Sequence, residues 1–168
     1  MTLIATPQQT SGPLFGFALL YDGSHHAVDP ERDDALTIEG RVTDESGLPL
    51  TWEAEVEFWI DDQFARARTM DDGVYAVVVR KPAARPAADG AVLAPYVNVL
   101  VFGRGITKRL DTRLYFPDED AANAADPVLA LVPADRRRTL VAHPTNQSRK
   151  LRFDIVLRGE NETVFFQY

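Results

Sequence analysis

Apolar and polar residues alternate along much of this chain, and a period of two is typical of β-strands. The clearest example spans residues 53–60, where Ala54, Val56, Phe58 and Ile60 share one face while three glutamates and a tryptophan occupy the other. This alternation predicts a half-buried strand. Comparable segments predict further strands over 35–43, 74–79, 97–102, 109–116, 151–157 and 163–168.

Turn signals separate the predicted strands. Residues 44–47 read Asp-Glu-Ser-Gly and residues 71–73 read Asp-Asp-Gly, and both compositions favour tight turns. Residues 82–94 are rich in proline and alanine, which predicts an irregular connection. Helical signals are short and occur over 118–125 and 134–141.

Many strands and few helices predict an all-β protein built as a two-sheet β-sandwich with one or two short helices. We expect one domain, in which residues 35–168 form the sandwich and residues 1–34 form an N-terminal arm and entry strand. The pattern of turns and strands between Gly40 and Tyr75 is similar to the prealbumin-like module, in which a β-meander packs two sheets face to face. That module serves many binding and adhesion domains, so the similarity indicates a fold and not a function.

The composition excludes several classes of function. The chain has 168 residues, no cysteine and a net charge of −7, which excludes disulfides, thiolate metal sites, cysteine nucleophiles and a basic surface for nucleic acid. No apolar segment is long enough to span a membrane, and the N-terminus lacks a basic region followed by an apolar one. We therefore expect a cytoplasmic protein that binds neither nucleic acid nor membrane.

The last third of the chain carries the most specific pattern. It contains Arg-Leu-Tyr-Phe at 113–116, Asp-Pro-Val-Leu-Ala-Leu-Val-Pro at 126–133 and Gly-Glu-Asn-Glu-Thr-Val-Phe-Phe at 159–166. Together these segments resemble the C-terminal half of the intradiol ring-cleavage dioxygenases, and most of all the α subunits of the protocatechuate 3,4-dioxygenases. The resemblance covers about residues 7–20 and 35–168. It implies the same sandwich fold and a place in the oxygen-dependent cleavage of catechols.

The resemblance also implies an Fe(III) site made of two tyrosinates and two histidines, with the histidines spaced as His-x-His so that both lie on one face of a strand. At the matching positions this chain has Tyr96 and Asn98. The two segments that match the tyrosine ligands, 59–64 and 83–88, contain no tyrosine. We therefore expect this chain to bind no metal itself and a homologous β subunit to carry the Fe(III).

Other groups that could bind a metal or transfer a proton have structural explanations. His25 and His26 are adjacent, so an extended backbone directs them to opposite sides, and we expect them to be exposed loop residues. The acidic residues at 61–62, 71–72 and 118–120 lie at predicted turns or at a predicted helix start, where Asp is favoured for capping and solvation.

In the α subunits of this family, the chain without iron lines part of its partner's substrate pocket. The resemblance assigns that role here to Thr10, Gly12 and Pro13 in the N-terminal arm and to Arg104. A glycine allows close approach of the backbone to a ligand, and a guanidinium suits a carboxylate such as that of protocatechuate. Each feature also has a simpler explanation, since Thr-Ser-Gly-Pro is an ordinary turn and Arg104 can be a solubilising charge at a hairpin tip.

Two main functional hypotheses follow. In the first, the chain is the α subunit of a higher-order hetero-oligomer whose iron-bearing β subunit converts protocatechuate or a related catechol to 3-carboxy-cis,cis-muconate. In the second, it is a prealbumin-like binding or assembly domain that keeps the scaffold and has lost the pocket. A third hypothesis, an iron enzyme acting alone, requires ligands at unrecognised positions.

Overall fold

A computed structural model describes residues 19–87 and 90–167 of the chain. The strands of its first sheet are β1 (Ala35–Thr43), β4 (Val74–Arg80), β9 (His143–Pro144), β10 (Lys150–Arg152) and β11 (Ile155–Val156). Strand β1 is central, because it pairs antiparallel with β4 on one side and parallel with β10 and β11 on the other. Strand β9 then pairs antiparallel with β10 at the edge.

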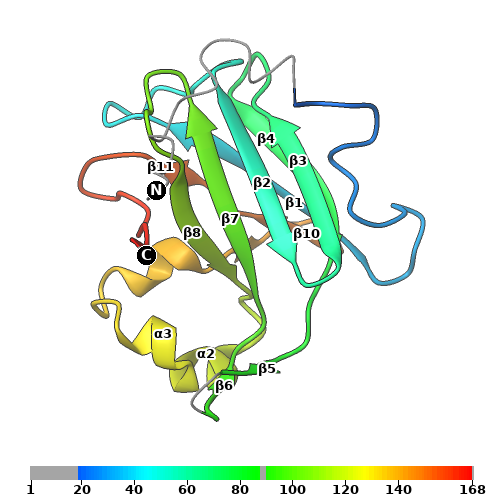
Figure 1. Cartoon of the computed structure of the whole chain (residues 1–168), viewed down its shortest axis with the longest axis vertical. Coiled ribbons are helices and arrows are strands. Elements are labelled where there is room, and N and C mark those ends of the chain that lie inside the picture. Colours follow the sequence, from blue (N-terminus) through cyan, green and yellow to red (C-terminus); the bar gives the residue numbers. More distant parts are fainter. Residues whose placement is uncertain (1–18, 88–89, 168) are drawn as a thin grey trace, which may run out of the picture.

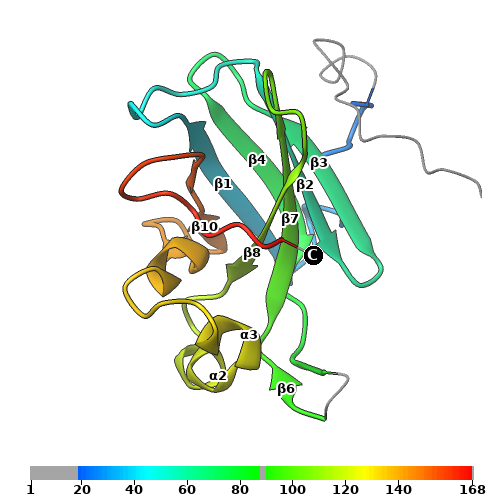
Figure 2. The ribbon, with the colours of Figure 1, turned by 60° about the vertical axis from the view of Figure 1, so that its left-hand side comes forward.

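The second sheet is antiparallel throughout. Its strands are β2 (Ala54–Ile60), β3 (Gln63–Arg68), β7 (Tyr96–Gly103) and β8 (Leu110–Tyr115). They follow the order β3-β2-β7-β8, so β3 and β8 form the two edges. Figure 2 shows this sheet facing the layer formed by β1 and β4.

The remaining elements are short and gather at one end of the sandwich (Figure 1). They are β5 (Arg85–Pro86), β6 (Val92–Leu93), the helices α2 (Asp120–Ala125) and α3 (Pro127–Ala130), and a 3-10 helix over Arg137–Leu140. Strands β5 and β6 pair with each other in the connection between β4 and β7. No helix in residues 19–87 and 90–167 is long and apolar enough to cross a membrane.

The core lies between the two sheets and is built from the inward positions of the alternating strands. Strand β2 contributes Val56 and Phe58, β7 contributes Val97 and Val99, and β1 contributes Ile38, all with no exposed surface. This burial removes branched and aromatic side chains from water, which is the main favourable contribution to folding. The all-β two-sheet sandwich predicted from the sequence is therefore confirmed.

Two predicted strands differ from those observed. The segment 151–157 is divided into β10 and β11 because the Asp154 carboxylate, rather than a backbone carbonyl, accepts the N–H of Arg41 at 2.9 Å. The segment 163–167 forms no continuous strand, and Phe166 alone makes a bridge, to Asp111 of β8. The Thr163 hydroxyl accepts the N–H of Val156 at 3.0 Å, so a side chain takes the place of a ladder carbonyl there.

The helices and the first edge strand were only partly predictable. The predicted helix over 118–125 is present as α2, whereas the segment 134–141 forms only the short 3-10 helix. Strand β3 and helix α3 were not predicted. The division of the chain at residue 34 stays a prediction, and between residues 19 and 34 the chain contains a bridge from His26 to Val78 and no longer strand.

Candidate functional site

The two positions matched to histidine ligands lie on the outer face of β7. Val97 and Val99 point into the core, so Tyr96 and Asn98 on the alternate positions share the opposite face. In the register of the sheet, Tyr96 lies opposite Tyr115 and Asn98 lies opposite Arg113. Only 7% of the Tyr96 surface is exposed, while Asn98 is half-buried.

Two guanidinium groups lie against the Tyr96 ring. The Cζ atom of Arg113, from β8, is 4.0 Å from the ring centroid, and that of Arg85, from β5, is 4.4 Å away. Cations bind favourably over the electron-rich face of an aromatic ring, and more strongly where water is excluded. The position matched to a metal ligand is thus surrounded by positive charge.

Arg85 also joins the two segments that the family resemblance matched to the tyrosine ligands of iron. Its Nη1 lies 2.5 Å from the carboxylate of Asp61 in the turn between β2 and β3, and its Nη2 donates to the backbone carbonyl of Tyr96 at 3.0 Å. Asp61 comes from segment 59–64 and Arg85 from segment 83–88. The structure therefore brings Tyr96 together with both segments matched to tyrosine ligands, and an arginine makes the contacts between them.

Next to this group, Tyr115 and Asp126 are buried and hydrogen-bonded to each other. The Tyr115 hydroxyl donates to Asp126 Oδ1 at 3.2 Å, and Asp126 also accepts the N–H groups of Val128 and Leu129 at the start of α3 and that of Ala94. Burial, the largest effect, raises the pKa of Tyr115 above its ordinary value. Its hydroxyl is thus already engaged by Asp126 within this chain.

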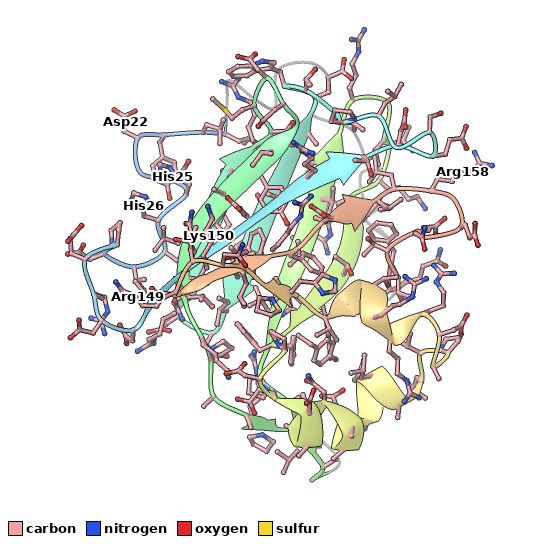
Figure 3. The ribbon with its side chains drawn as sticks, turned by 180° about the vertical axis from the view of Figure 1, so that it is seen from behind. Asp22, His25, His26, Arg149, Lys150 and Arg158 are labelled. Carbon is pink, nitrogen blue, oxygen red and sulfur yellow. The ribbon has the colours of Figure 1, made fainter. Side chains whose placement is uncertain are left out.

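The residues at this site do not fit an iron ion. Non-haem iron requires several converging nitrogen and oxygen ligands. The guanidinium groups of Arg85 and Arg113 would instead repel a metal cation placed beside them. Residues 19–87 and 90–167 contain no group of three or more His, Cys, Asp and Glu side chains that could hold a metal. The exposed His25 and His26, with ring centroids 3.9 Å apart, lie on the loop before β1, far from α2 and α3 (Figure 3).

Arg104 lies at the opposite end of β7 from Tyr96. Eight residues of extended strand separate the two positions by about 26 Å, so they cannot line one pocket within this chain. The Arg104 side chain is 73% exposed and its Nη1 contacts the carboxylate of Glu53 at 2.8 Å. The adjacent Gly105 has a φ of 81°, which turns the chain sharply behind the arginine. Thr10, Gly12 and Pro13 lie outside the described residues.

The alternation in the sequence predicted that the outer face of β2 would be exposed, but the two glutamates on this face are buried. Glu55 has no exposed surface and Glu57 only 5%. Arg66 of β3 lies over both, with its Nε 2.9 Å from Glu57 Oε1 and 3.4 Å from Glu55 Oε1, and its Nη1 donates to the carbonyl of Leu19. Burial, the largest effect, raises the pKa of Glu55 to about 7. The half-buried prediction is therefore wrong at Glu55 and Glu57, whereas Trp59 on the same face of β2 is 46% exposed as the alternation predicted.

Comparison with solved structures supports the fold. The chain superimposes on hydroxyquinol 1,2-dioxygenase from Pseudomonas putida with a TM-score of 0.60 and 14% identity, covering 92% of this chain and 63% of that chain. The dioxygenase domain of a dioxygenase and carbohydrate-binding protein fusion from Streptomyces sp. SirexAA-E gives the same TM-score at 21% identity, covering 80% and 87%. No protein-family model matches the chain.

Two curated relatives are similar over nearly their whole length. The protocatechuate 3,4-dioxygenase alpha chain of Burkholderia cepacia is 37% identical over 98% of both chains. The alpha chain of the same enzyme from Pseudomonas putida is 34% identical over 97% of this chain and 96% of its own. The chain belongs to the protocatechuate 3,4-dioxygenase alpha chain family. This membership confirms the resemblance noted from the sequence and makes the chain the alpha subunit of an oxidoreductase.

Several residues of this alpha chain site were missed by sequence reasoning. Arg85 and Arg113 carry the charge around Tyr96, and Asp126 anchors the helix beside it. Their partners lie up to 32 residues away in the sequence, as for Asp126 and Ala94, so no local spacing links them. The one available signal was an arginine inside the segment 83–88, where a tyrosine ligand was sought.

Proposed function

We propose that this chain is the α subunit of a protocatechuate 3,4-dioxygenase, binds no iron itself and completes the substrate pocket of a homologous, iron-bearing β subunit. The complex inserts both atoms of O2 between the two hydroxyl-bearing carbons of protocatechuate, which gives 3-carboxy-cis,cis-muconate. The Fe(III) of the β subunit supplies the activation of the catecholate toward O2. The observation that carries this proposal is the identity to two alpha chains over nearly the full length of each.

The charge around Tyr96 supports the division of labour between two subunits. Two guanidinium groups lie against Tyr96, where Fe(III) would require anionic and imidazole donors. The reacting metal must therefore be held elsewhere. A homologous partner with a complete ligand set meets that requirement, and we place the two chains together in a cytoplasmic hetero-oligomer.

Within that complex, Arg104 binds the carboxylate of protocatechuate, and Thr10, Gly12 and Pro13 line the same pocket wall. The exposure of Arg104 supports this role, because its guanidinium is available to a neighbouring subunit. Its ion pair with Glu53 is on the surface, and such pairs contribute little, so exchange for a substrate carboxylate is inexpensive. The distance along β7 between Arg104 and Tyr96 is consistent with a pocket that belongs to the partner.

The substitution Arg104→Ala in the assembled complex tests this role. Loss of a charge-assisted hydrogen bond of about 1.5–3 kcal/mol raises the KM for protocatechuate by about tenfold or more and leaves the KM for catechol nearly unchanged. Arg109→Ala is the matched control, since Arg109 is also exposed, lies in the same connection and pairs with Asp111. Equal effects of Arg104→Ala on both substrates would remove Arg104 from carboxylate binding.

The proposed function itself is tested by reconstitution. The β subunit is purified with and without this chain, and O2 uptake is measured with protocatechuate. We expect full activity only when both chains are present. A β subunit that is equally active alone and does not associate with this chain would overturn the proposal.

A further inference from the structure

Arg85 holds together three parts of the chain that are distant in the sequence. It starts from β5, contacts the Asp61 carboxylate in the β2–β3 turn at 2.5 Å, and donates to the Tyr96 carbonyl of β7 at 3.0 Å. Its guanidinium also lies over the Tyr96 ring. The side chain is 24% exposed, so most of it is removed from water.

The groups around Arg85 are those that any cation attracts. They are a carboxylate oxygen, a carbonyl oxygen and the face of an aromatic ring, all of which carry negative charge or electron density. A metal ion gathers oxygen ligands from separate segments in the same way. A planar guanidinium does this with directed N–H donors and cannot lose its charge at any physiological pH.

The connection between β4 and β7 contains only a short backbone pairing, which makes the arginine important there. Strands β5 and β6 are two residues each, and a pair of such short strands is only marginally stable. Asp61 has a positive φ of 42°, a conformation that costs energy in a residue with a side chain. The connection between β4 and β7 therefore has little backbone pairing of its own to fix its position, whereas the β2–β3 turn, closed by the pair Ile60–Gln63, is held by its hairpin and offers Arg85 a firm attachment.

We propose that Arg85 is an internal cation that takes the structural place of a bound metal, joining the β2–β3 turn, the β5–β6 connection and the start of β7. This inference rests on the proposed function in one respect, since it explains how a subunit without iron keeps this end of the sandwich ordered. Arg85 is a positioning residue, because it acts on the arrangement of these segments and touches no reacting atom. Arg113 adds a second cation on Tyr96 and reinforces the exclusion of metal ions.

The first test is the thermal stability of the full chain carrying Arg85→Ala. We expect the Tm to fall by roughly 5–10 °C. The matched control is Arg68→Ala, because the Arg68 guanidinium lies the same 4.4 Å from the centroid of its aromatic partner, Trp52, which is 41% exposed. That control is expected to shift the Tm by no more than about 2 °C.

The second test separates a cation from a mere packing group. Guanidinium chloride at about 50 mM, where its denaturing effect is small, should raise the Tm of the Arg85→Ala chain relative to an equal concentration of NaCl. It should not raise the Tm of the wild-type chain or of Arg68→Ala. Hydrogen exchange should show the loosening of Arg85→Ala confined, among the described residues, to 60–64, 83–87 and 90–96.

Two results would overturn the inference. One is an Arg85→Ala chain whose Tm stays within about 2 °C of the wild type. The other is a lower Tm that guanidinium does not raise more than NaCl does, which would make Arg85 a packing residue. If Arg85→Ala does not fold, Arg85→Lys replaces it. Lysine keeps the positive charge but lacks the planar guanidinium group, so the Tm of this variant should lie below that of the wild type although the chain still folds. Association with the β subunit is measured separately, so a failure of the proposed function leaves these Tm results interpretable.

Discussion

Glu55 offers the sharpest quantitative prediction about this protein. Its carboxylate has no exposed surface, and neither oxygen accepts a hydrogen bond from the described residues. The nearest cation, Arg66, has its Nε 3.4 Å from Glu55 and is engaged more closely by Glu57. Burial therefore outweighs the arginine and raises the pKa of Glu55 from 4.5 to about 7.

The sign of the pH dependence follows from this pKa. Between pH 4.5 and about 7 the folded chain keeps a proton on Glu55 that the unfolded chain has released, so the free energy of unfolding decreases as the pH rises through this interval. Over this interval the free energy of unfolding decreases by about 1.4 kcal/mol for each pH unit, which gives a total decrease of about 3 kcal/mol. Above pH 7 the loss is complete and no longer changes.

The substitution Glu55→Gln removes the titrating group and keeps its shape. We expect it to raise the free energy of unfolding by about 1–3 kcal/mol at pH 8 and by much less at pH 4.5. Urea denaturation at both pH values measures the difference. The control is Glu57→Gln on the same face of β2, because Glu57 accepts hydrogen bonds from Arg66 and from the Trp59 indole at 2.9 Å.

The two substitutions should have opposite signs. Glu57→Gln leaves Arg66 without its closest carboxylate and should lower stability by about 1–3 kcal/mol at pH 8. A Glu55→Gln chain that is less stable than the wild type at pH 8 would contradict the raised pKa of Glu55. The same holds if the free energies of unfolding of Glu55→Gln and of the wild type differ equally at pH 4.5 and at pH 8. Glu55 would then carry no extra proton in the folded chain.

Two further substitutions test the packing around the core and the site. A Cβ atom on Gly40 would lie 1.8 Å from the carbonyl oxygen of Phe153, so Gly40→Ala should cost more than about 3 kcal/mol in urea denaturation. Gly47→Ala, with open space around it and a φ of 76°, should cost only about 1 kcal/mol. Asp126→Ala removes the N-cap of α3 and two further buried hydrogen bonds, from Ala94 and Tyr115, and should cost about 2–4 kcal/mol, against less than about 0.5 kcal/mol for the exposed Asp120→Ala.

The sequence predicted those strands whose inward side chains are large. The period of two in β2 and β7 is carried by valine, isoleucine and phenylalanine, and both strands are where the pattern placed them. Strand β3 was missed because its inward positions are Gln63, Ala65 and Ala67, which produce no strong apolar period. Small inward residues leave a strand without a sequence signal, although its backbone pairs as fully as that of its neighbours.

The candidate site was less predictable than the fold. The spacing of Tyr96 and Asn98 correctly indicated that they share one strand face, because alternation is a local property of the backbone. The contacts of Arg85 depend instead on how three distant segments meet. The burial of Glu55 likewise depends on Arg66, in a strand that was not predicted. Whether Thr10, Gly12, Pro13 and Arg104 line a pocket depends on a second chain and stays a prediction.

The central claim, that this alpha chain acts with an iron-bearing partner, is tested most directly by purifying the tagged full-length chain from its native extract. The mass of the co-purifying chain, the iron content and the visible absorbance are measured on the same sample. We predict a homologous partner in equal amount, iron bound to the complex with the absorption of Fe(III)–tyrosinate, and O2 uptake that depends on protocatechuate. A colourless, iron-free preparation, either of this chain alone or with an unrelated protein, would contradict the claim and favour a prealbumin-like binding domain.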